Sequence, residues 1–500
     1  GNSNYTTSTS AATSHSVQAN AATVTVGVSP SSAVNGQTVT FTASVTGGAG
    51  TPTGSVQFKV DGIDLNSAVT LSSGTALTSG SLAAGAHVVT AAYSGDGTYG
   101  PANGSFGTYT VSLGGTSTAI SDNGSSPTVA GVAYSVSYSV AVTAPAAGAP
   151  TGTVTISDGT GGTCTGAAPF GSCQITSSTA GVKTLTASYG GDTRFAASQS
   201  SITHTVSAAT PALAVSSSAP SAVFGQPVTL TTTVTGSAGI PSGTVQFVVD
   251  GVNAGTAVTL SGSGTATRSV TLTVGSHTVA ANYSGNATYS AGSASLAGGQ
   301  TVGQGATSTT LVRSAGTDPS ASGTSVTFTA TVAVSAPAAG TPGGTVQFRV
   351  DGLDAGAPVA IVGGAAAFST SSLTTGAHSI TAIYSGNTSF TGSTSAALSH
   401  TVSVPDAAAS TVSVDVASVT VGSGGTVTIT VRDASGNLLG GVSVSLSAAP
   451  AGGLVLGTAS VTNAAGVTTA TFTGQSVGQY TVTVQAGGVT LANTVVITVN

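Results

Sequence analysis

Charged side chains are rare in this sequence. Seven Lys and Arg and thirteen Asp are the only charged residues among 500, and Glu, Met and Trp are absent. An average soluble protein is about 25% charged. Helices rely on Glu, Lys, Arg, Met and Leu, so the composition disfavours a largely helical protein. The cations are also scattered, which excludes the continuous basic surface that binding to nucleic acid requires.

Long apolar runs are missing as well. No stretch of about 18 apolar residues occurs, so we expect no membrane insertion by this segment. Disorder is disfavoured, because 40% of the residues are hydrophobic and the few charges cause little self-repulsion. The chain starts at Gly1-Asn2-Ser3, without an initiator Met or a signal-peptide pattern. This start favours a removed leader or a piece of a longer chain.

Internal repeats dominate the sequence. One motif occurs as GSVQFKVDG from Gly54, GTVQFVVDG from Gly243, GTVQFRVDG from Gly344 and, in degenerate form, GTVTISDG from Gly152. About 25 residues later the copies share a second motif, LxxGxHxVxAxYSG, in which the second copy has Lys183 in place of His. An aromatic residue then follows at intervals of 96, 94 and 101 residues: Tyr99, Phe195, Tyr289 and Phe390. The chain is therefore a tandem array.

The first residues match the end of a repeat. The segment GNSNYTTSTSAATSHSV at the start of the chain aligns with GNTSFTGSTSAALSHTV from Gly386. We therefore predict that residues 1–20 are the closing strand of a preceding repeat. The chain is then a fragment of a longer array. The alternative is a processed subunit whose orphan strand adds to the sheet of a neighbouring molecule.

Each repeat alternates apolar and polar residues with a period of two, as strands do. About seven short strands per repeat, separated by turn residues, predict a two-sheet sandwich. In the first copy we expect strands at 23–28, 38–45, 56–60, 68–71, 75–82, 87–93 and 109–113. Asp-Gly pairs at Asp61, Asp250 and Asp351 predict tight hairpins. Thr and Ser occupy the solvent-facing side, so the edge strands carry few of the charged side chains that usually prevent pairing with strands of other molecules.

The junctions between repeats are short, near 112–117, 207–211, 303–308 and 403–410. Short linkers limit bending, which predicts a semi-rigid rod. From the rise of a strand and the size of a sandwich, five modules would extend over about 150–200 Å.

The only two cysteines, Cys164 and Cys173, lie nine positions apart in a Gly-rich segment. Two Cys without a neighbouring His cannot supply the four ligands of a structural zinc site. A local disulfide that closes a hairpin is the favoured interpretation, and two buried free thiols are the alternative. Disulfides belong to oxidising compartments, so the favoured interpretation indicates export.

The repeated motifs resemble the bacterial Ig-like domain family, group 3. Members of that family are similar to P-x-GTVTF-x-DG followed by L-x-x-G-x-H-x-I-x-A-x-YSGD-x-x-Y, and the match covers residues 1–403. The last hundred residues are similar to group 1, invasin- and intimin-like modules, through VTITVRDASGNLLGGVSVSLSA from Val427 and NAAGVTTATFTG from Asn463. The resemblance implies an all-β fold: a tandem array of immunoglobulin-like β-sandwich modules, about seven strands each, in an extended rod.

We expect the chain to divide accordingly. The closing strand at 1–20 precedes Ig-like repeats at 21–113, 114–207 (with the disulfide hairpin), 208–302 and 303–403, and an invasin- or intimin-like module follows at 404–500.

No residue set predicts catalysis, and we expect no catalytic, cofactor-binding or metal-binding residues. The histidines recur with the module, as His87, His277 and His378 and as His15, His204 and His400, so we interpret them as solvent-facing strand residues. A GxSxG string at 474–478 lies at a turn between strands, unlike a hydrolase elbow. The DGxD pairs Asp61/Asp64 and Asp351/Asp354 predict hairpin turns. Calcium at the junctions, near Asp122, Asp318 and Asp406, is the alternative.

The resemblance implies a non-enzymatic stalk of an exported, adhesin-like bacterial surface protein, which holds a binding tip away from the cell. We therefore expect an extracellular or cell-surface location. The expected partners are neighbouring Ig-like modules, a host or surface ligand, or further copies of the chain. The alternative function is a subunit of a self-assembling extracellular filament or sheath, joined by strand addition through the N-terminal strand.

Overall fold

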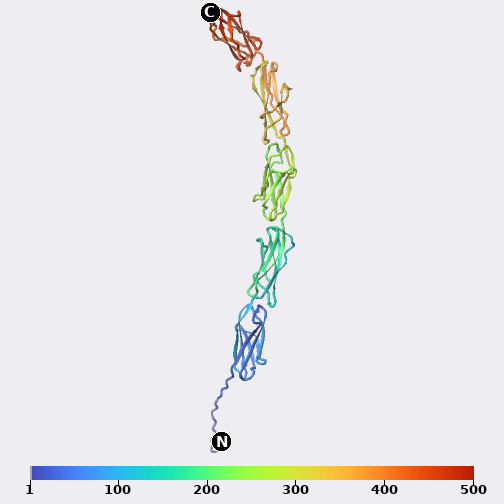
Figure 1. Cartoon of the computed structure of the whole chain (residues 1–500), viewed down its shortest axis with the longest axis vertical. Helices are drawn as coiled ribbons and strands as arrows, with labels where there is room; N and C mark the ends of the chain where they lie inside the picture. Colours follow the sequence, from blue (N-terminus) through green and yellow to red (C-terminus); the bar gives the residue numbers. More distant parts are fainter. Residues whose placement is uncertain (1–2) are drawn as a thin grey trace.

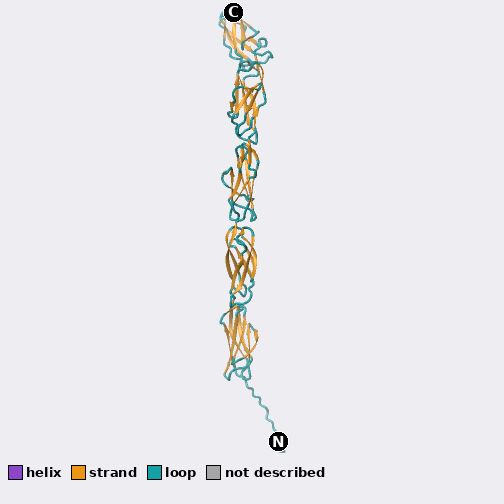
Figure 2. Cartoon of the chain, turned by 90° about the vertical axis from the view of Figure 1, so that its right-hand side faces the viewer, coloured by secondary structure: helices purple, strands orange, loops and turns teal. Residues whose placement is uncertain are grey.

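The computed structural model describes residues 3–500, which form strands, turns and loops and contain no helix (Figure 2). The strands gather into five modules that follow one another end to end along a long rod, with the two chain ends at opposite ends (Figure 1). The all-β tandem array predicted from the sequence is therefore confirmed.

Module 1 is a sandwich of two sheets. One sheet has the order β1-β3-β6 and the other β2-β8-β7-β4-β5. Its strands are β1 (Ala22–Ser29), β2 (Ala33–Val34), β3 (Thr38–Gly47), β4 (Ser55–Val60), β5 (Ile63–Thr70), β6 (Thr75–Ser81), β7 (Gly85–Tyr93) and β8 (Ala102–Ser112). The short β2 pairs with β8 in parallel, so the start and the end of the module are hydrogen-bonded side by side.

Modules 2 and 3 repeat this plan. Module 2 contains β9 (Thr116–Asp122), β10 (Thr128–Val129), β11 (Ala133–Val142), β12 (Thr153–Ser157), β13 (Thr163–Ala167), β14 (Phe170–Thr176), β15 (Gly181–Tyr189) and β16 (Ser198–Ser207). Module 3 contains β17 (Ala212–Ser217), β18 (Ser221–Val223), β19 (Val228–Thr235), β20 (Thr244–Val249), β21 (Val252–Asn253), β22 (Val258–Thr259), β23 (Thr265–Val270), β24 (Gly275–His277), β25 (Val279–Tyr283), β26 (Gly292–Ser295) and β27 (Gln300–Gly303).

Modules 4 and 5 complete the rod. Module 4 contains β28 (Thr307–Ala315), β29 (Ser320–Ala321), β30 (Val326–Val334), β31 (Thr345–Val350), β32 (Leu353–Asp354), β33 (Val359–Ala360), β34 (Ala365–Thr370), β35 (Gly376–Tyr384), β36 (Ser393–Thr394) and β37 (Leu398–Ser403). Module 5 contains β38 (Thr411–Val414), β39 (Ser418–Val419), β40 (Gly424–Thr430), β41 (Val444–Ala449), β42 (Leu454–Leu456), β43 (Val467–Gly474), β44 (Gly478–Ala486), β45 (Val489–Thr490) and β46 (Val495–Val499).

Each module buries its own core between its two sheets. In β3 the side chains of Val39, Phe41, Ala43 and Val45 are buried, and the residues between them are partly or fully exposed. Alternation of Val or Phe with Thr or Ser thus gives one apolar face and one wet face without charge. Burial of the apolar face is the main favourable term in folding each sandwich.

The structure adds detail that the sequence pattern did not contain. The strand predicted at 68–71 is longer and runs over 63–70, and the last strand begins at Ala102 rather than Tyr109. The predicted Asp-Gly hairpins are confirmed. Asp61 and Gly62 both have positive φ, 54° and 82°, and Val60 pairs with Ile63. This is the backbone that a two-residue type I′ turn requires.

The N-terminal segment forms no strand over residues 3–19, and its side chains are exposed from Ser3 to Ala19. Residues 1 and 2 of the predicted closing strand lie outside the described residues. That strand and the predicted module limits stay proposals. All strands lie within those limits except β27, which extends one residue past the limit at 302.

Candidate functional site

The junction between two modules is held by backbone hydrogen bonds from the linker. Gly114, just before module 2, donates from its N–H to Arg194 O at 2.8 Å and accepts from Ala196 N at 2.9 Å. The same parallel bridge recurs in modules 1 to 4, as Asn20–Tyr99, Gly114–Phe195, Ala209–Tyr289 and Gly305–Phe390. Each linker is therefore fixed to the module that it enters.

The recurring aromatic residue is the buried centre of this bridge. Tyr99, Phe195, Tyr289 and Phe390 are at most 2% exposed. In modules 1 and 3 the phenol also bonds a loop: the hydroxyl of Tyr99 accepts from Ala49 N at 2.6 Å and donates to Gly50 O at 2.9 Å. The aromatic residue was recognised in the sequence by its recurrence. The structure shows that it binds the linker where the chain enters each of modules 1 to 4.

An acid or amide three residues before the aromatic caps the same turn, a role that we did not predict from the sequence. Asp96 accepts from the N–H groups of Thr98 and Tyr99 and, through its second oxygen, from Thr53 N. The hydrogen bond from Thr53 is the largest cause that lowers the pKa of Asp96 well below its usual range. The same position is occupied by Asp192, Asn286 and Asn387. The recurrent spacing of Asp or Asn before the aromatic is the signal that could have found it.

Neighbouring modules also touch directly. Asn35, 4% exposed, follows β2 of module 1 and accepts from Ala147 N of module 2 at 3.1 Å. At the next residue, Gly36, a Cβ atom would lie 2.2 Å from Ala147 O, so only glycine allows this approach. Modules 3 and 4 repeat the contact: Phe224 O accepts from Ala339 N at 3.2 Å.

Apolar side chains cross two of the junctions. The ring of Phe224 in module 3 meets the ring of Phe390 in module 4 edge to face, with centroids 5.3 Å apart. Ala321 of module 4 packs into the core of module 5. These contacts and the short linkers restrict rotation of one module against the next, which is the physical basis of a rod.

A histidine bridges two elements at one end of modules 1, 3 and 4. His87 Nδ1 lies 2.7 Å from Asp61 Oδ2, and His87 Nε2 lies 2.8 Å from Ala83 O. His277 and His378 make the same pair of contacts. Because carboxylate and carbonyl oxygens only accept hydrogen bonds, both ring nitrogens donate in the protonated imidazolium. The structure therefore favours the charged form at these three sites.

The pKa values follow this geometry. Burial works against the charged form of His87, but the bonds to Asp61 and Ala83 outweigh it and raise its pKa. The bond to Asp250 is the largest cause that raises the pKa of His277.

The second set of histidines lies on the last strand of the module. His204 and His400 are 1% exposed, and Tyr109 and Gln300 occupy the same position in modules 1 and 3. We call this position the closing-strand anchor. Each anchor bonds either the short parallel strand or the segment just before it, through Tyr109 to Pro30 O, His204 to Thr128 Oγ1, Gln300 to Ala219 O and His400 to Ser320 Oγ.

The interpretation of the repeated histidines as solvent-facing residues is therefore wrong for the five that lie in modules. Two anchors are fully buried, and the other three side chains are only 9–14% exposed. The two sets are cross-strand partners, as in His378 opposite His400. The alternating pattern of a strand predicts the face of the sheet on which a residue lies. It does not predict whether other parts of the module cover that face and bury the residue. His15 lies exposed in the N-terminal segment.

The edges of the two sheets meet along one side of each sandwich, and the modules close this side differently. In module 2, Cys164 on β13 and Cys173 on β14 form a disulfide between the two sheets, with Cα atoms 5.9 Å apart. In module 1 the matching residues are Leu65 and Thr78, and Asn66 Nδ2 donates to Thr78 Oγ1 at 2.9 Å. The cysteine pair is thus one of several closures of the same edge.

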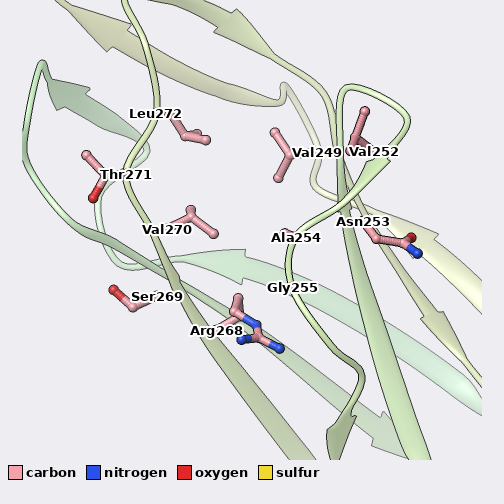
Figure 3. A pocket seen from close by; sticks show the side chains of 10 residues that line it. All are labelled: Val249, Val252, Asn253, Ala254, Gly255, Arg268, Ser269, Val270, Thr271 and Leu272. Carbon is pink, nitrogen blue, oxygen red and sulfur yellow. The ribbon is translucent and has the colours of Figure 1, made fainter.

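Module 3 lacks an apolar side chain or a disulfide that fills this edge, and a hydrogen bond from Arg268 to Thr256 O crosses it. Its matching residues are Ala254 and Arg268, and a shallow pocket of about 420 Å³ lies between them (Figure 3). The apolar walls of the pocket are Val249, Val252, Val270 and Leu272, and Arg268 extends across one end and bonds Thr256 O. A small residue at 254 leaves the space that Leu65 fills in module 1.

This correspondence predicts an engineered cross-link. With Ala254→Cys and Arg268→Cys, module 3 should form a disulfide like that of module 2, because the two positions match Cys164 and Cys173 in register. The bond should stabilise module 3 by about 2–3 kcal/mol. Mass spectrometry of the unreduced double variant should show two more thiols lost than in wild type. Ala254→Cys alone is the control, and two remaining thiols in the oxidised double variant would contradict the register.

Acidic residues do not gather anywhere in the part of the chain that the structure describes: no three His, Cys or Asp side chains lie close enough to hold a metal ion. Asp122, Asp318 and Asp406 each accept a backbone N–H nearby, from Gly124, Thr401 and Ala408. Asp64 and Asp354 pair with Lys59 and Arg349 at 2.8 and 2.6 Å. In the GxSxG string, Ser476 bonds the Tyr480 hydroxyl at 2.8 Å.

Fold and junctions together define a tandem array of Ig-like β-sandwich modules. The chain belongs to the bacterial Ig-like domain family: the group 3 domain matches residues 24–112, 123–207, 215–303 and 312–403, and the group 1 domain matches 410–500. The resemblance inferred from the motifs is confirmed, including the change of group at the last module. No curated protein matches the chain.

Three solved structures have a similar fold. A 1.5-MDa bacterial ice-binding adhesin is 18% identical, with 57% of this chain and 99% of that chain covered and a TM-score of 0.25. A Ca²⁺-stabilised adhesin of an Antarctic bacterium that binds ice is 18% identical, with 77% and 100% covered and a TM-score of 0.25. Invasin, a bacterial integrin-binding protein, is 19% identical, with 58% and 60% covered and a TM-score of 0.31. Across residues 3–500 there is no helix that could span a membrane.

Proposed function

We propose that the chain is a non-enzymatic stalk of an exported bacterial surface protein, which spaces a binding tip from the cell. The observation that carries this proposal is the set of contacts between successive modules, such as Asn35 with Ala147, Phe224 with Phe390 and Ala321 with the core of module 5, which join separate cores into one rod. A rod of fixed modules transmits position and tension, and its wet Thr and Ser faces keep it soluble. The ligand at the tip would be a host or surface molecule.

An extracellular location is part of the proposal. The disulfide in module 2 supports it, because such bonds persist in oxidising compartments. The expected partners are neighbouring Ig-like modules of a longer chain, as the resemblance of residues 1–20 to a closing strand suggests.

Small-angle scattering and negative-stain microscopy of the purified chain test the stalk. We expect isolated rods with a maximum dimension of about 150–200 Å, from roughly 30–40 Å per sandwich. The dimension should stay the same over a hundredfold range of concentration. A compact particle would contradict the rod. Filaments that grow with concentration, and that are lost when residues 1–19 are deleted, would favour the alternative of a self-assembling subunit.

A further inference from the structure

The closing-strand anchor differs chemically between modules. Tyr109 and Gln300 carry no titratable group near neutral pH, whereas the anchors of modules 2 and 4 are His204 and His400. The anchor residue joins the end of a module to its beginning, because its partner lies in the short parallel strand or just before it. A change of charge at this position therefore acts on the contact that holds the two ends of the module together.

The surroundings of His204 allow the neutral imidazole only. Its Nε2 atom lies 2.7 Å from Thr128 Oγ1, and its Nδ1 atom is buried without a hydrogen-bond partner. The ring stacks on Tyr134 of β11, with centroids 4.4 Å apart. Protonation would place a charge with an unsatisfied N–H inside the module, which is costly.

The charged groups around this site do not compensate the charge. Lys183 on β15 lies directly opposite His204 in the strand register and is 5% exposed, so a protonated His204 would add a second buried cation. Asp158 lies beyond Tyr134, where it accepts from Ser177, which also bonds the Tyr134 hydroxyl. Burial lowers the pKa of His204 from its usual value.

Two further side-chain bonds link β16 to the segment before β10: Asn123 Nδ2 donates to Thr203 O at 3.3 Å, and Ser126 Oγ accepts from Thr205 N at 3.2 Å. Strands β10 and β16 pair in parallel over two residues, Thr128 with Val206 and Val129 with Ser207. Ala130 N donates to Ser207 O at 2.9 Å just beyond this pair. The His204–Thr128 contact is thus one of three side-chain bonds between β16 and residues 123–128, and it is the least exposed of the three.

We propose that His204 is an acid-sensitive lock of module 2, and that mild acid loosens this module while modules 1 and 3 stay closed. In acid, β16 separates from β10, and a chain under tension lengthens first at module 2. The proposal concerns the folding of one module and does not depend on the stalk function.

Modules 1, 3 and 4 provide the contrast. In modules 1 and 3 the charged form of His87 and His277 is stabilised by Asp61 and Asp250, so these modules gain stability in acid. Module 4 has both kinds of group. His378 pairs with Asp351, while His400 is buried with Asp318 3.4 Å from its Nδ1 and with His378 and Arg313 also near. In module 4 the stability gained in acid through His378 opposes the stability lost through His400. Module 2 has a buried histidine without an Asp-paired one, so acid only lowers its stability.

The sign and the window follow from proton linkage. An unfolded histidine takes up a proton below about pH 6.5, and His204 in the folded module does so only at lower pH, so stability falls as the pH drops below that value. For one such group, the folding equilibrium constant falls up to about 30-fold at pH 5 relative to pH 7.5. Aspartates with pKa values at or below about 4 do not titrate in this window.

Hydrogen exchange of the whole chain, measured by mass spectrometry at pH 7.5 and 5 and corrected for intrinsic rates, tests the proposal. We expect the protection of β10 and β16 amides to fall about 10- to 30-fold at pH 5, with β2 and β8 of module 1 unchanged or better protected. His204→Gln, which copies the anchor of module 3, should remove the acid response. In Gln300→His, the new buried histidine lies opposite His277 and should oppose the acid stabilisation that His277 gives to module 3, so the protection of β18 and β27 at pH 5 should fall relative to wild type.

Two results would overturn the lock. One is an equal acid response in wild type and His204→Gln. The other is a loss of protection spread evenly over the modules. If His204→Gln fails to fold, the comparison of Gln300→His with wild type decides the question: protection of β18 and β27 should be lower in the variant at pH 5 but not at pH 7.5, and the absence of this difference counts against the proposal. Rod dimensions by scattering at pH 7.5 should be the same in all variants, so the stalk is judged separately.

Discussion

Replacing Phe390 by alanine should lower the stability of module 4 by about 3–5 kcal/mol, the usual cost of removing a buried aromatic ring. The side chain is 2% exposed and belongs to the core of module 4, where it also meets Phe224 of module 3. Unfolding of the whole chain is not two-state, so the measurement is hydrogen exchange resolved by module. Protection of β30, β31 and β35 should fall, while module 1 keeps its protection.

Phe224→Ala is the matched control, because it removes the same ring contact from the other side of the junction. Phe224 is only partly buried against the core of module 4. The loss should be limited to about 0.5–1.5 kcal/mol for the aromatic pair, with a broader distribution of angles between modules 3 and 4 in micrographs. An equal loss of module 4 stability in both variants would show that the ring serves the junction rather than the core.

Much of the fold followed from the sequence because the physics is local. Strand alternation, Asp-Gly turns and a repeat that returns the same aromatic residue all depend on nearby residues, so they can be seen in one chain. The closing-strand anchor could not be seen in this way. The same position is occupied by side chains of different chemistry in modules 1 to 4: Tyr109, His204, Gln300 and His400. Their hydrogen-bond partners lie about 80 residues earlier in the chain. Only the pairing of first and last strands reveals their common role.

The candidate site was predictable to the same limited extent. The cysteines could be singled out because the sequence contains only two. The sequence predicted that they close a hairpin, but β13 and β14 belong to different sheets. The disulfide closes this edge in module 2, and Leu65 fills the same edge in module 1. In module 3 the small side chain of Ala254 leaves a pocket there. A contact between sheets depends on how two edges approach each other, which no local pattern contains. The few charged residues also have local roles. Most Asp side chains cap turns or form ion pairs within one module, and the solvent-facing sides of the strands carry Thr and Ser instead.

Changing Cys164 and Cys173 together to serine should lower the stability of module 2 by about 2–3 kcal/mol, from the entropy of the short loop that the bond closes. The bond joins the two sheets, so its loss should loosen β13 and β14 first. Hydrogen exchange should show lower protection there at pH 7.5, with modules 1 and 3 unchanged. Treating the wild-type chain with a reductant should give the same pattern, because it breaks the same bond without any substitution.

The comparison of reductant and substitution separates the bond from the side chains. If the double serine variant loses protection but the reduced wild type does not, packing of the sulfur atoms rather than the covalent link stabilises the edge. If mass spectrometry finds two free thiols in protein purified without reductant, the disulfide is absent and the support that it gives to an oxidising, extracellular location is lost. An intact bond whose removal weakens only module 2 supports both the closure of this edge and the proposed export of the chain.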